Sequence, residues 1–179
     1  MPPVIRHTKS MALCKRLMAT PEFSNAKVIM IYLPLPDEVD VSSVALRGWH
    51  EEKIIAAPKL TWDKRHMLPI QIQSLEIGLV PTRAGIREPT EGEPLAIETL
   101  DMVLVPALVF DIKGNRIGRG AGFYDRFLNS PMFQGVSMGV AFEEQVVDKL
   151  PVEPHDVPVD MLITDERLIR IKTDNIHAG

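Results

Sequence analysis

The segment Met102–Phe110, with sequence MVLVPALVF, is the strongest strand signal in the chain. It leads into Asp111–Gly114 (DIKG), which predicts a turn, and then into the glycine-rich segment Gly118–Arg126 (GRGAGFYDR). A short continuous apolar run is typical of a strand that is covered on both faces of a sheet. A helix is expected from about Tyr124. A strand that passes through a glycine-rich loop into a helix is typical of α/β folds that bind phosphate groups.

Outward from this segment, short apolar runs alternate with amphipathic segments. Strands are expected at Lys27–Leu35, Lys53–Ala57 (stopped by Pro58), His66–Gln73, Val136–Phe142, Met161–Thr164 and, as a last edge strand, Leu168–Lys172. Helices are expected over Thr8–Met18 and, capped by Asp40, over Val41–Trp49, whereas Gly85–Glu93 is expected to be loop. This alternation predicts one α/β domain over residues 1–179, with a doubly wound, mainly parallel sheet and helices on both faces.

Composition and charge exclude several classes of function. The 179 residues are 45% apolar and 25% charged, which are ordinary values for a globular protein, and the formal charge of −4 argues against a nucleic-acid partner. No apolar run approaches the roughly 20 residues that span a bilayer, and no secretory signal is recognisable. A single cysteine and five scattered histidines argue against a disulfide and against a Cys- or His-based metal site. We therefore expect a cytoplasmic protein without a membrane partner; its oligomeric state is left open.

The glycine-rich segment has the chemistry of an anion site. Alternating glycines let the backbone approach a ligand closely because no Cβ stands in the way, and successive N–H groups converge on an anion. Arg116 and Arg119 are suited to charge-assisted bonds with phosphate oxygens, and Asp125 is suited either to capping the helix or to holding Mg²⁺. The spacing is neither that of a Walker A loop nor that of a dinucleotide fingerprint. The residues alone therefore leave a phosphate site and a structural tight turn both open.

A longer string around this loop, Phe110–Leu128 (FDIKGNRIGRGAGFYDRFL), resembles the signature of the 5-formyltetrahydrofolate cyclo-ligases, also called 5,10-methenyltetrahydrofolate synthetases. The likeness continues, in order, in Tyr32–Asp40 (YLPLPDEVD), Ala57–Pro58, Gly85–Pro89 (GIREP), Ala141–Gln145 (AFEEQ), Leu150–Pro151, His155–Asp160 (HDVPVD) and Ile163–Thr164. Ordered matches along nearly the whole chain are far more specific than one loop.

The resemblance implies an ATP- and Mg²⁺-dependent enzyme of folate metabolism. Such enzymes transfer the γ-phosphoryl group of ATP to the formyl oxygen of 5-formyltetrahydrofolate, which releases ADP. The neighbouring N10 nitrogen then attacks the activated carbon, and phosphate leaves to give 5,10-methenyltetrahydrofolate. An amide-like formyl oxygen is a poor leaving group, so phosphorylation makes its removal feasible in water. The protein's share is positioning and charge neutralisation.

The resemblance also implies residues for the nucleotide side of the site. The ATP-binding residues that it implies are Arg116, Gly118, Arg119, Gly120, Ala121, Gly122, Phe123 and Tyr124. Arg119 and Tyr124 are also the implied catalytic residues. Asp125 and Asp156 match the family's Mg²⁺-associated carboxylates.

On the folate side, Leu33 and Glu38 match positions that line the family's folate site. Glu38 is suited to accepting hydrogen bonds from the N–H donors of the pterin. Tyr124 is expected between the two substrates, where it orients the formyl group. Structural interpretations stay open beside these roles, since Asp125 can cap a helix, Asp156 can brace a turn and Glu38 can be a solvated loop acid.

Some features depart from the family pattern. Family members usually begin with a helix carrying a Lys-x-x-Leu-Arg-like segment that reaches the nucleotide, and this segment is expected to be missing here. Ala121 stands where the family often has Gly or Lys, and Phe123 stands where a tyrosine is common. Because alanine resists positive φ, Ala121 is expected in an ordinary backbone conformation. Trp62 is expected either to line a ligand cleft or to cover the sheet edge.

Two alternatives to the enzyme therefore remain. The first is a non-catalytic relative that binds folate or a nucleotide. The second is a sugar-phosphate- or CoA-handling α/β protein whose glycine loop holds that phosphate.

Overall fold

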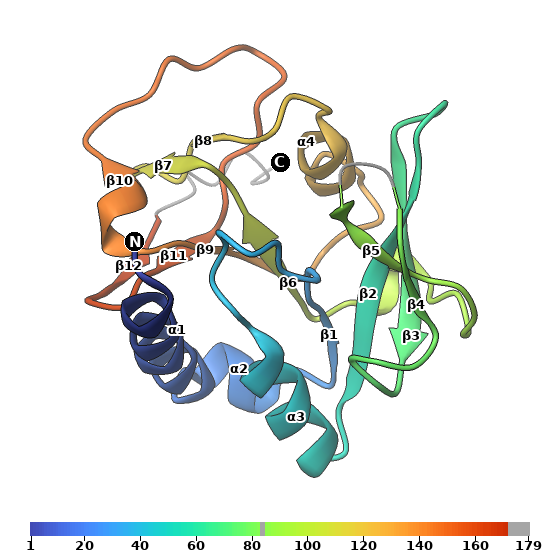
Figure 1. The fold of residues 1–179 in the computed structure, drawn as a ribbon. Helices are drawn as coiled ribbons and strands as arrows, with labels where there is room; N and C mark the ends of the chain where they lie inside the picture. Colours follow the sequence, from blue (N-terminus) through green and yellow to red (C-terminus); the bar gives the residue numbers. More distant parts are fainter. Residues whose placement is uncertain (83–84, 172–179) are drawn as a thin grey trace.

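A computed structural model describes residues 1–82 and 85–171, and a mixed seven-stranded sheet forms its centre (Figure 1). The strands of this sheet are β1 Val28–Met30, β2 Ile54–Thr61, β3 His66–Ile72, β6 Met102–Pro106, β9 Val136–Val140, β11 Met161–Ile163 and β12 Leu168–Arg170. Their order is β12-β11-β9-β6-β1-β2-β3. The inner strands are parallel, and β3 and β12 are antiparallel edge strands. The predicted mainly parallel α/β sheet is confirmed.

Helices cover both faces of this sheet, as predicted, although unequally. They are α1 Pro3–Met18, α2 Pro21–Asn25, α3 Ser42–His50 and α4 Phe123–Leu128. Leu104 of β6 lies in one core cluster with Leu13 of α1, together with residues of α2 and α3. Its neighbours Val103 and Val105 lie in the other cluster with Phe127 of α4. Successive residues of a strand point to opposite faces, so a strand buried on both faces needs an unbroken apolar run. None of the helices in the two described ranges is long and apolar enough to cross a bilayer.

The segment Met102–Phe110 is not one strand, which corrects the prediction. It divides between β6 and β7, and β7 belongs to a separate three-stranded sheet of order β10-β7-β8. The strands of this second sheet are β7 Val109–Asp111, β8 Arg116–Ile117 and β10 Val146–Val147. Pro106 has no N–H donor with which to extend the ladder, so the strand ends there. The predicted turn is confirmed, because the Gly114 N–H donates to the Asp111 carbonyl (3.0 Å).

Pro58 lies inside β2 and does not stop it, contrary to the prediction. It faces Pro69 across the antiparallel β2–β3 pair. The Ile31 N–H donates to the Ala56 carbonyl (2.9 Å), so the backbone groups of Ala56 face β1. Residues two apart in a strand point their backbone groups to the same side, so the missing N–H of Pro58 would also point toward β1. Strand β1 ends at Met30 and does not extend as far as Pro58. The proline therefore removes no hydrogen bond from the β2–β3 ladder.

Other predicted bounds also need correction. Helix α1 begins at Pro3, not at Thr8, because proline fits the first turn of a helix, where its missing N–H has no partner to lose. The expected loop Gly85–Glu93 contains β5 Arg87–Pro89, which forms an antiparallel pair with β4 Leu79–Pro81. Only Val28–Met30 of the expected strand Lys27–Leu35 is strand. Lys172, the expected end of the last strand, lies outside the described residues.

The outer edge of β3 is paired with the chain that follows the β4–β5 hairpin. The Gln71 N–H donates to the Glu93 carbonyl (2.9 Å), and the Leu95 N–H donates to the Pro69 carbonyl (2.8 Å). Pro94, between these two residues, forms a β-bridge with Ile70. From Pro69 to Gln71, this edge is therefore closed by backbone hydrogen bonds from the same chain.

Candidate functional site

An ion pair joins the glycine loop to the segment that follows β1. Arg119 Nη2 lies 3.1 Å from each carboxylate oxygen of Asp37, and Arg119 Nε lies 3.8 Å from Glu38 Oε1. The segment that contains both acids begins at the carboxyl end of a central parallel strand, where ligands bind in open α/β sheets. The structure thus brings Arg119, predicted for ATP, to Glu38, predicted for folate.

The backbone of the glycine loop is not covered by other protein atoms at Gly120 and Gly122. Gly120 and Gly122 have φ values of +91° and +71°, whereas Ala121 between them is not in the positive-φ region, as predicted. A Cβ built on either glycine meets no atom within 4 Å. The helix that follows, α4, is only six residues long. The free space above the loop is room that a ligand can occupy.

A cavity of about 320 Å³ opens on this loop. It is lined by Arg65, Gly120, Ala121, Gly122, Asp125, Arg126, Asn129 and His155. The loop residues and Asp125 were predicted for the nucleotide side. Arg65 was missed, because no sequence signal places the β2–β3 turn beside α4. Arg126, Asn129 and His155 were also missed, although Arg126 and His155 lie in segments that carry the family resemblance.

Arg116 holds Asp125 in place and does not line this cavity. Its side chain is only 5% exposed; Nη2 donates to Asp125 Oδ1 (2.7 Å), and Nη1 donates to the Val157 carbonyl. Burial lowers the pKa of this guanidinium, while the negative charge of Asp125 opposes the shift. The Val157 N–H also donates to Asp125 Oδ1 (3.3 Å). A direct bond from Arg116 to phosphate stays a prediction.

The two predicted metal ligands are adjacent through Val157, whose N–H reaches Asp125 and which directly follows Asp156. Asp156 Oδ2 accepts the Glu153 N–H (2.8 Å), and Asp156 Oδ1 lies 3.5 Å from His155 Nε2. In the described part of the chain, no three His, Cys, Asp or Glu side chains form a cluster able to hold a metal ion. The assignment of both carboxylates to a metal stays a prediction.

Glu38 is a largely buried carboxylate, with its side chain 15% exposed. Its Oε2 accepts the Leu35 N–H (2.9 Å). Burial raises the pKa of Glu38, and the Leu35 hydrogen bond and Arg119 oppose that shift. Burial and then the charge of Glu38 raise the pKa of the Tyr124 phenol, so this phenol keeps its proton at neutral pH. Tyr124 is therefore available as an O–H donor near the acid.

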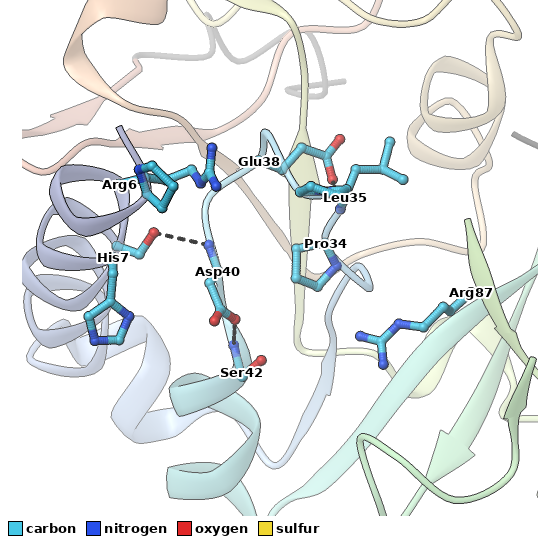
Figure 2. Close-up of a pocket in the computed structure, with 11 residues that line it drawn as sticks. Arg6, His7, Pro34, Leu35, Glu38, Asp40, Ser42 and Arg87 are labelled. Atoms are coloured by element: carbon cyan, nitrogen blue, oxygen red, sulfur yellow. Dashed lines mark hydrogen bonds between the residues drawn. The ribbon is translucent and has the colours of Figure 1, made fainter. Parts of the chain in front are cut away.

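A second cavity, of about 330 Å³, lies beside Glu38, between α1 and the segment after β1 (Figure 2). It is lined by Pro3, Arg6, His7, Ser10, Pro34, Leu35, Pro36, Glu38, Asp40, Ser42 and Arg87. Figure 2 shows Arg6 and His7 on the α1 side and Arg87 on the opposite side. The Asp40 N–H donates to Ser10 Oγ (3.1 Å), which fastens the segment to α1. Leu33, predicted for folate, is buried in the core just before the lining residues.

The comparisons with known proteins agree with the sequence resemblance. A family model described as the 5-formyltetrahydrofolate cyclo-ligase family matches residues 1–165. This chain belongs to that family. A cyclo-ligase from Mus musculus is 33% identical over 171 residues, covering 90% of this chain and 84% of the relative. A cyclo-ligase from Escherichia coli K12 is 30% identical over 156 residues, covering 86% of each.

Solved structures of cyclo-ligase relatives share the fold. The 5,10-methenyltetrahydrofolate synthetase of Aquifex aeolicus superposes with a TM-score of 0.81 at 31% identity, covering 100% of this chain and 91% of the other. A synthetase from Mycoplasma pneumoniae, 23% identical with a TM-score of 0.73, has the same fold. The predicted family is confirmed, and the sugar-phosphate or CoA alternative finds no support in these comparisons.

Phe123, directly after the glycine loop, is a packing residue of the core. It is 8% exposed, and its ring packs edge-on against Trp62, with centroids 5.0 Å apart at 89°. Trp62 follows β2 at the end of the β2–β3 hairpin and lines neither of the two cavities described above, so both roles expected for it stay predictions. The contact anchors that hairpin to the loop. A contact of Phe123 with ATP stays a prediction.

Arg119 pairs with Asp37, so we expect Asp37 and the phosphates of ATP to compete for its guanidinium. Both side chains are largely exposed (45% and 66%), so the pair stabilises the fold by only about 0–1 kcal/mol. We expect Asp37→Asn to leave the melting temperature within about 3 °C and to tighten ATP binding by about two- to fivefold, measured by isothermal titration calorimetry. Glu98→Gln, which neutralises an exposed acid before the amino end of β6, is the control and should change neither. Equal ATP affinity of Asp37→Asn and the unaltered chain would contradict the competition.

Proposed function

We propose that this chain catalyses the ATP-dependent cyclisation of 5-formyltetrahydrofolate to 5,10-methenyltetrahydrofolate, with release of ADP and phosphate. The observation that carries the proposal is the contact of Arg119 with Asp37 and Glu38. It brings a loop suited to polyphosphate next to a segment suited to a pterin. Phosphoryl transfer between two substrates requires this proximity. The family match over residues 1–165 supports the same reaction.

On the nucleotide side, we assign the phosphates of ATP to the backbone of residues 118–124 and to Arg119. Negative charge spreads over the γ-phosphoryl oxygens in the transition state, and fixed N–H donors and a guanidinium stabilise it there. When ATP binds, Arg119 releases the carboxylate of Asp37 and donates to a phosphate oxygen instead. Arg116 acts as a positioning residue, because its guanidinium holds Asp125 and the carbonyl of Val157.

On the folate side, we assign Glu38 to the pterin N–H donors, with Leu33 packed beneath, and Tyr124 to the formyl group. The formyl oxygen attacks the γ-phosphorus, and the bond from that phosphorus to the ADP oxygen breaks. The N10 nitrogen then attacks the formyl carbon, loses its proton, and expels the phosphate with the former formyl oxygen. The raised pKa of Tyr124 supports its role as a donor that orients the formyl group.

We further propose that Asp125, with Asp156 beside it, holds Mg²⁺ together with the phosphates. Asp125 lines the cavity on the glycine loop, and its side chain is 27% exposed. Mg²⁺ that is bound with phosphates takes only one or two carboxylates from the protein, so this donor set fits the ion without a larger acidic cluster. When bound, Mg²⁺ supplies neutralisation of the phosphate charge.

We propose the cytoplasm as the compartment of the reaction. Cys14 is the single cysteine of the chain and is buried. A fold that uses no intrachain disulfide is typical of a reducing compartment.

The direct test incubates the purified protein with 5-formyltetrahydrofolate, Mg²⁺ and ATP and follows methenyl absorbance. We expect product only when all three are present, with one ADP formed for each methenyl group. Failure to form product while folate still binds would contradict catalysis and favour the non-catalytic relative. If the protein binds neither folate nor ATP, the result would contradict both the enzyme and the non-catalytic binding relative.

A further inference from the structure

The cavity on the glycine loop contains two guanidinium groups to which the proposed reaction gives no role. Arg65, on the turn between β2 and β3, and Arg126, on α4, line it together with residues 120–122. The arginine ion pairs of the described ranges involve other residues, namely Arg47, Arg116, Arg119, Arg167 and Arg170. Within the described chain, the two cavity arginines therefore have no carboxylate partner.

The fold holds Arg65 at this place. Its φ is +53°, a left-handed backbone conformation that residues with a side chain rarely adopt. The turn is closed by hydrogen bonds between Thr61 and His66, and the contact of Trp62 with Phe123 anchors it to the start of α4. The position of Arg65 over the glycine loop thus follows from packing on both sides of the turn.

The other charged groups around the cavity are already engaged. Asp125 Oδ1 accepts from Arg116. His155 Nε2 lies 3.4 Å from a Glu153 oxygen and 3.5 Å from Asp156 Oδ1, so its side chain faces these two acids. Among the residues that line the cavity, Arg65 and Arg126 are the permanently charged side chains without a carboxylate partner in the described ranges. The ligand that fits this cavity is an anion with several oxygens.

We propose that Arg65 and Arg126 bind the phosphate oxygens of ATP on the glycine loop and thereby select a polyphosphate ligand. The inference rests on the proposed function, because it takes ATP as the ligand of this loop. A guanidinium donates two parallel N–H bonds to phosphate oxygens, and such charge-assisted bonds are stronger than neutral ones. Both residues act on nucleotide affinity and leave the folate side unchanged.

The test compares Arg65→Asn and Arg126→Gln with the unaltered chain. Asparagine tolerates the left-handed backbone at position 65, and glutamine suits the exposed helix position 126. The matched control is Lys64→Gln, which removes the same charge from an exposed residue of the same turn that does not line the cavity. Titration calorimetry measures the Kd of ATP and of inorganic tripolyphosphate, and steady-state kinetics measures the KM for 5-formyltetrahydrofolate.

We expect each arginine substitution to raise the Kd of both ATP and tripolyphosphate about tenfold or more. The folate KM and the melting temperature should stay unchanged, and Lys64→Gln should bind like the unaltered chain. Unchanged Kd values for both arginine variants would overturn the inference while the ATP binding and turnover of the unaltered chain still support the proposed function. An equal loss in Lys64→Gln would overturn it as well, because the effect would then be general surface charge.

Two further results decide the remaining cases. If Arg65→Asn lowers the melting temperature, Arg126→Gln decides alone, since its side chain is exposed on α4. If the unaltered chain binds neither ATP nor tripolyphosphate, the inference and the proposed function are both overturned.

Discussion

Replacing Gly122 by asparagine is expected to lower kcat/KM for ATP about 100-fold, because misplacing a bound substrate by about 1 Å can have an effect of that size. Gly122 has φ +71° and ψ +17°, the left-handed conformation that asparagine tolerates best after glycine. A Cβ there meets no protein atom within 4 Å, so the fold accepts the side chain. The same side chain occupies part of the cavity that we assign to the phosphates.

The melting temperature separates this effect from misfolding, and we expect it to stay within about 3 °C of the unaltered chain. Gly78→Asn is the matched control, because Gly78 has φ +77° and only ordinary contacts around its Cβ, and does not line the cavity. It should keep full activity. A Gly122→Asn variant that uses ATP normally would show that the loop does not hold the phosphates.

Glu38→Gln is expected to lower kcat/KM for 5-formyltetrahydrofolate by about 10- to 150-fold, the range for losing a hydrogen bond to a charged group. One carboxylate oxygen becomes an NH₂ donor that faces the N–H donors of the pterin. Because burial raises the pKa of Glu38, the activity of the unaltered chain should fall as the pH drops through this raised pKa. Initial rates at limiting folate over a pH series measure both effects.

The same substitution should keep or raise stability at neutral pH. A raised pKa in the folded state means that the associated stability is present at acid pH and is lost as the pH rises through the folded pKa. Ionised Glu38 therefore opposes folding at neutral pH, and glutamine removes that charge while its oxygen still accepts the Leu35 N–H. A lower melting temperature, or a normal folate KM, would contradict this account. Asp37→Asn, which changes the adjacent and more exposed acid, should leave the folate KM unchanged.

The fold could be predicted where burial alone decides the structure. The apolar run Met102–Phe110 correctly indicated a strand covered on both faces, and residues 103–105 alternate between the two core clusters. The run gave no sign that β6 and β7 lie in different sheets, because buried strands of either sheet are equally apolar. Pro58 was wrongly predicted to end its strand, because a missing N–H breaks a sheet only where a neighbouring strand would have accepted its hydrogen bond.

The candidate site also has a part that could be predicted from the sequence and a part that could not. The glycine loop and Glu38 were found through contiguous motifs, which local sequence preserves. Arg65 reaches its cavity only through the packing of the β2–β3 hairpin, and its surroundings in the sequence have no distinctive pattern. Arg87 lies in the recognised segment Gly85–Pro89, but nothing in that segment shows that its side chain faces the cavity beside Glu38. The spacing of Arg116 could not show whether its guanidinium faces a ligand or a carboxylate nine residues away.

The backbone pairing along β3 has a consequence for the protein at high concentration. An unpaired strand edge is a template on which another copy can add a strand, and this is a common route to aggregation and domain swapping. Here the outward-facing groups of Pro69 and Gln71 are already bonded to Leu95 and Glu93, and Pro94 has no N–H to offer. A chain with many strongly apolar strands is thus protected against self-association along this part of the edge.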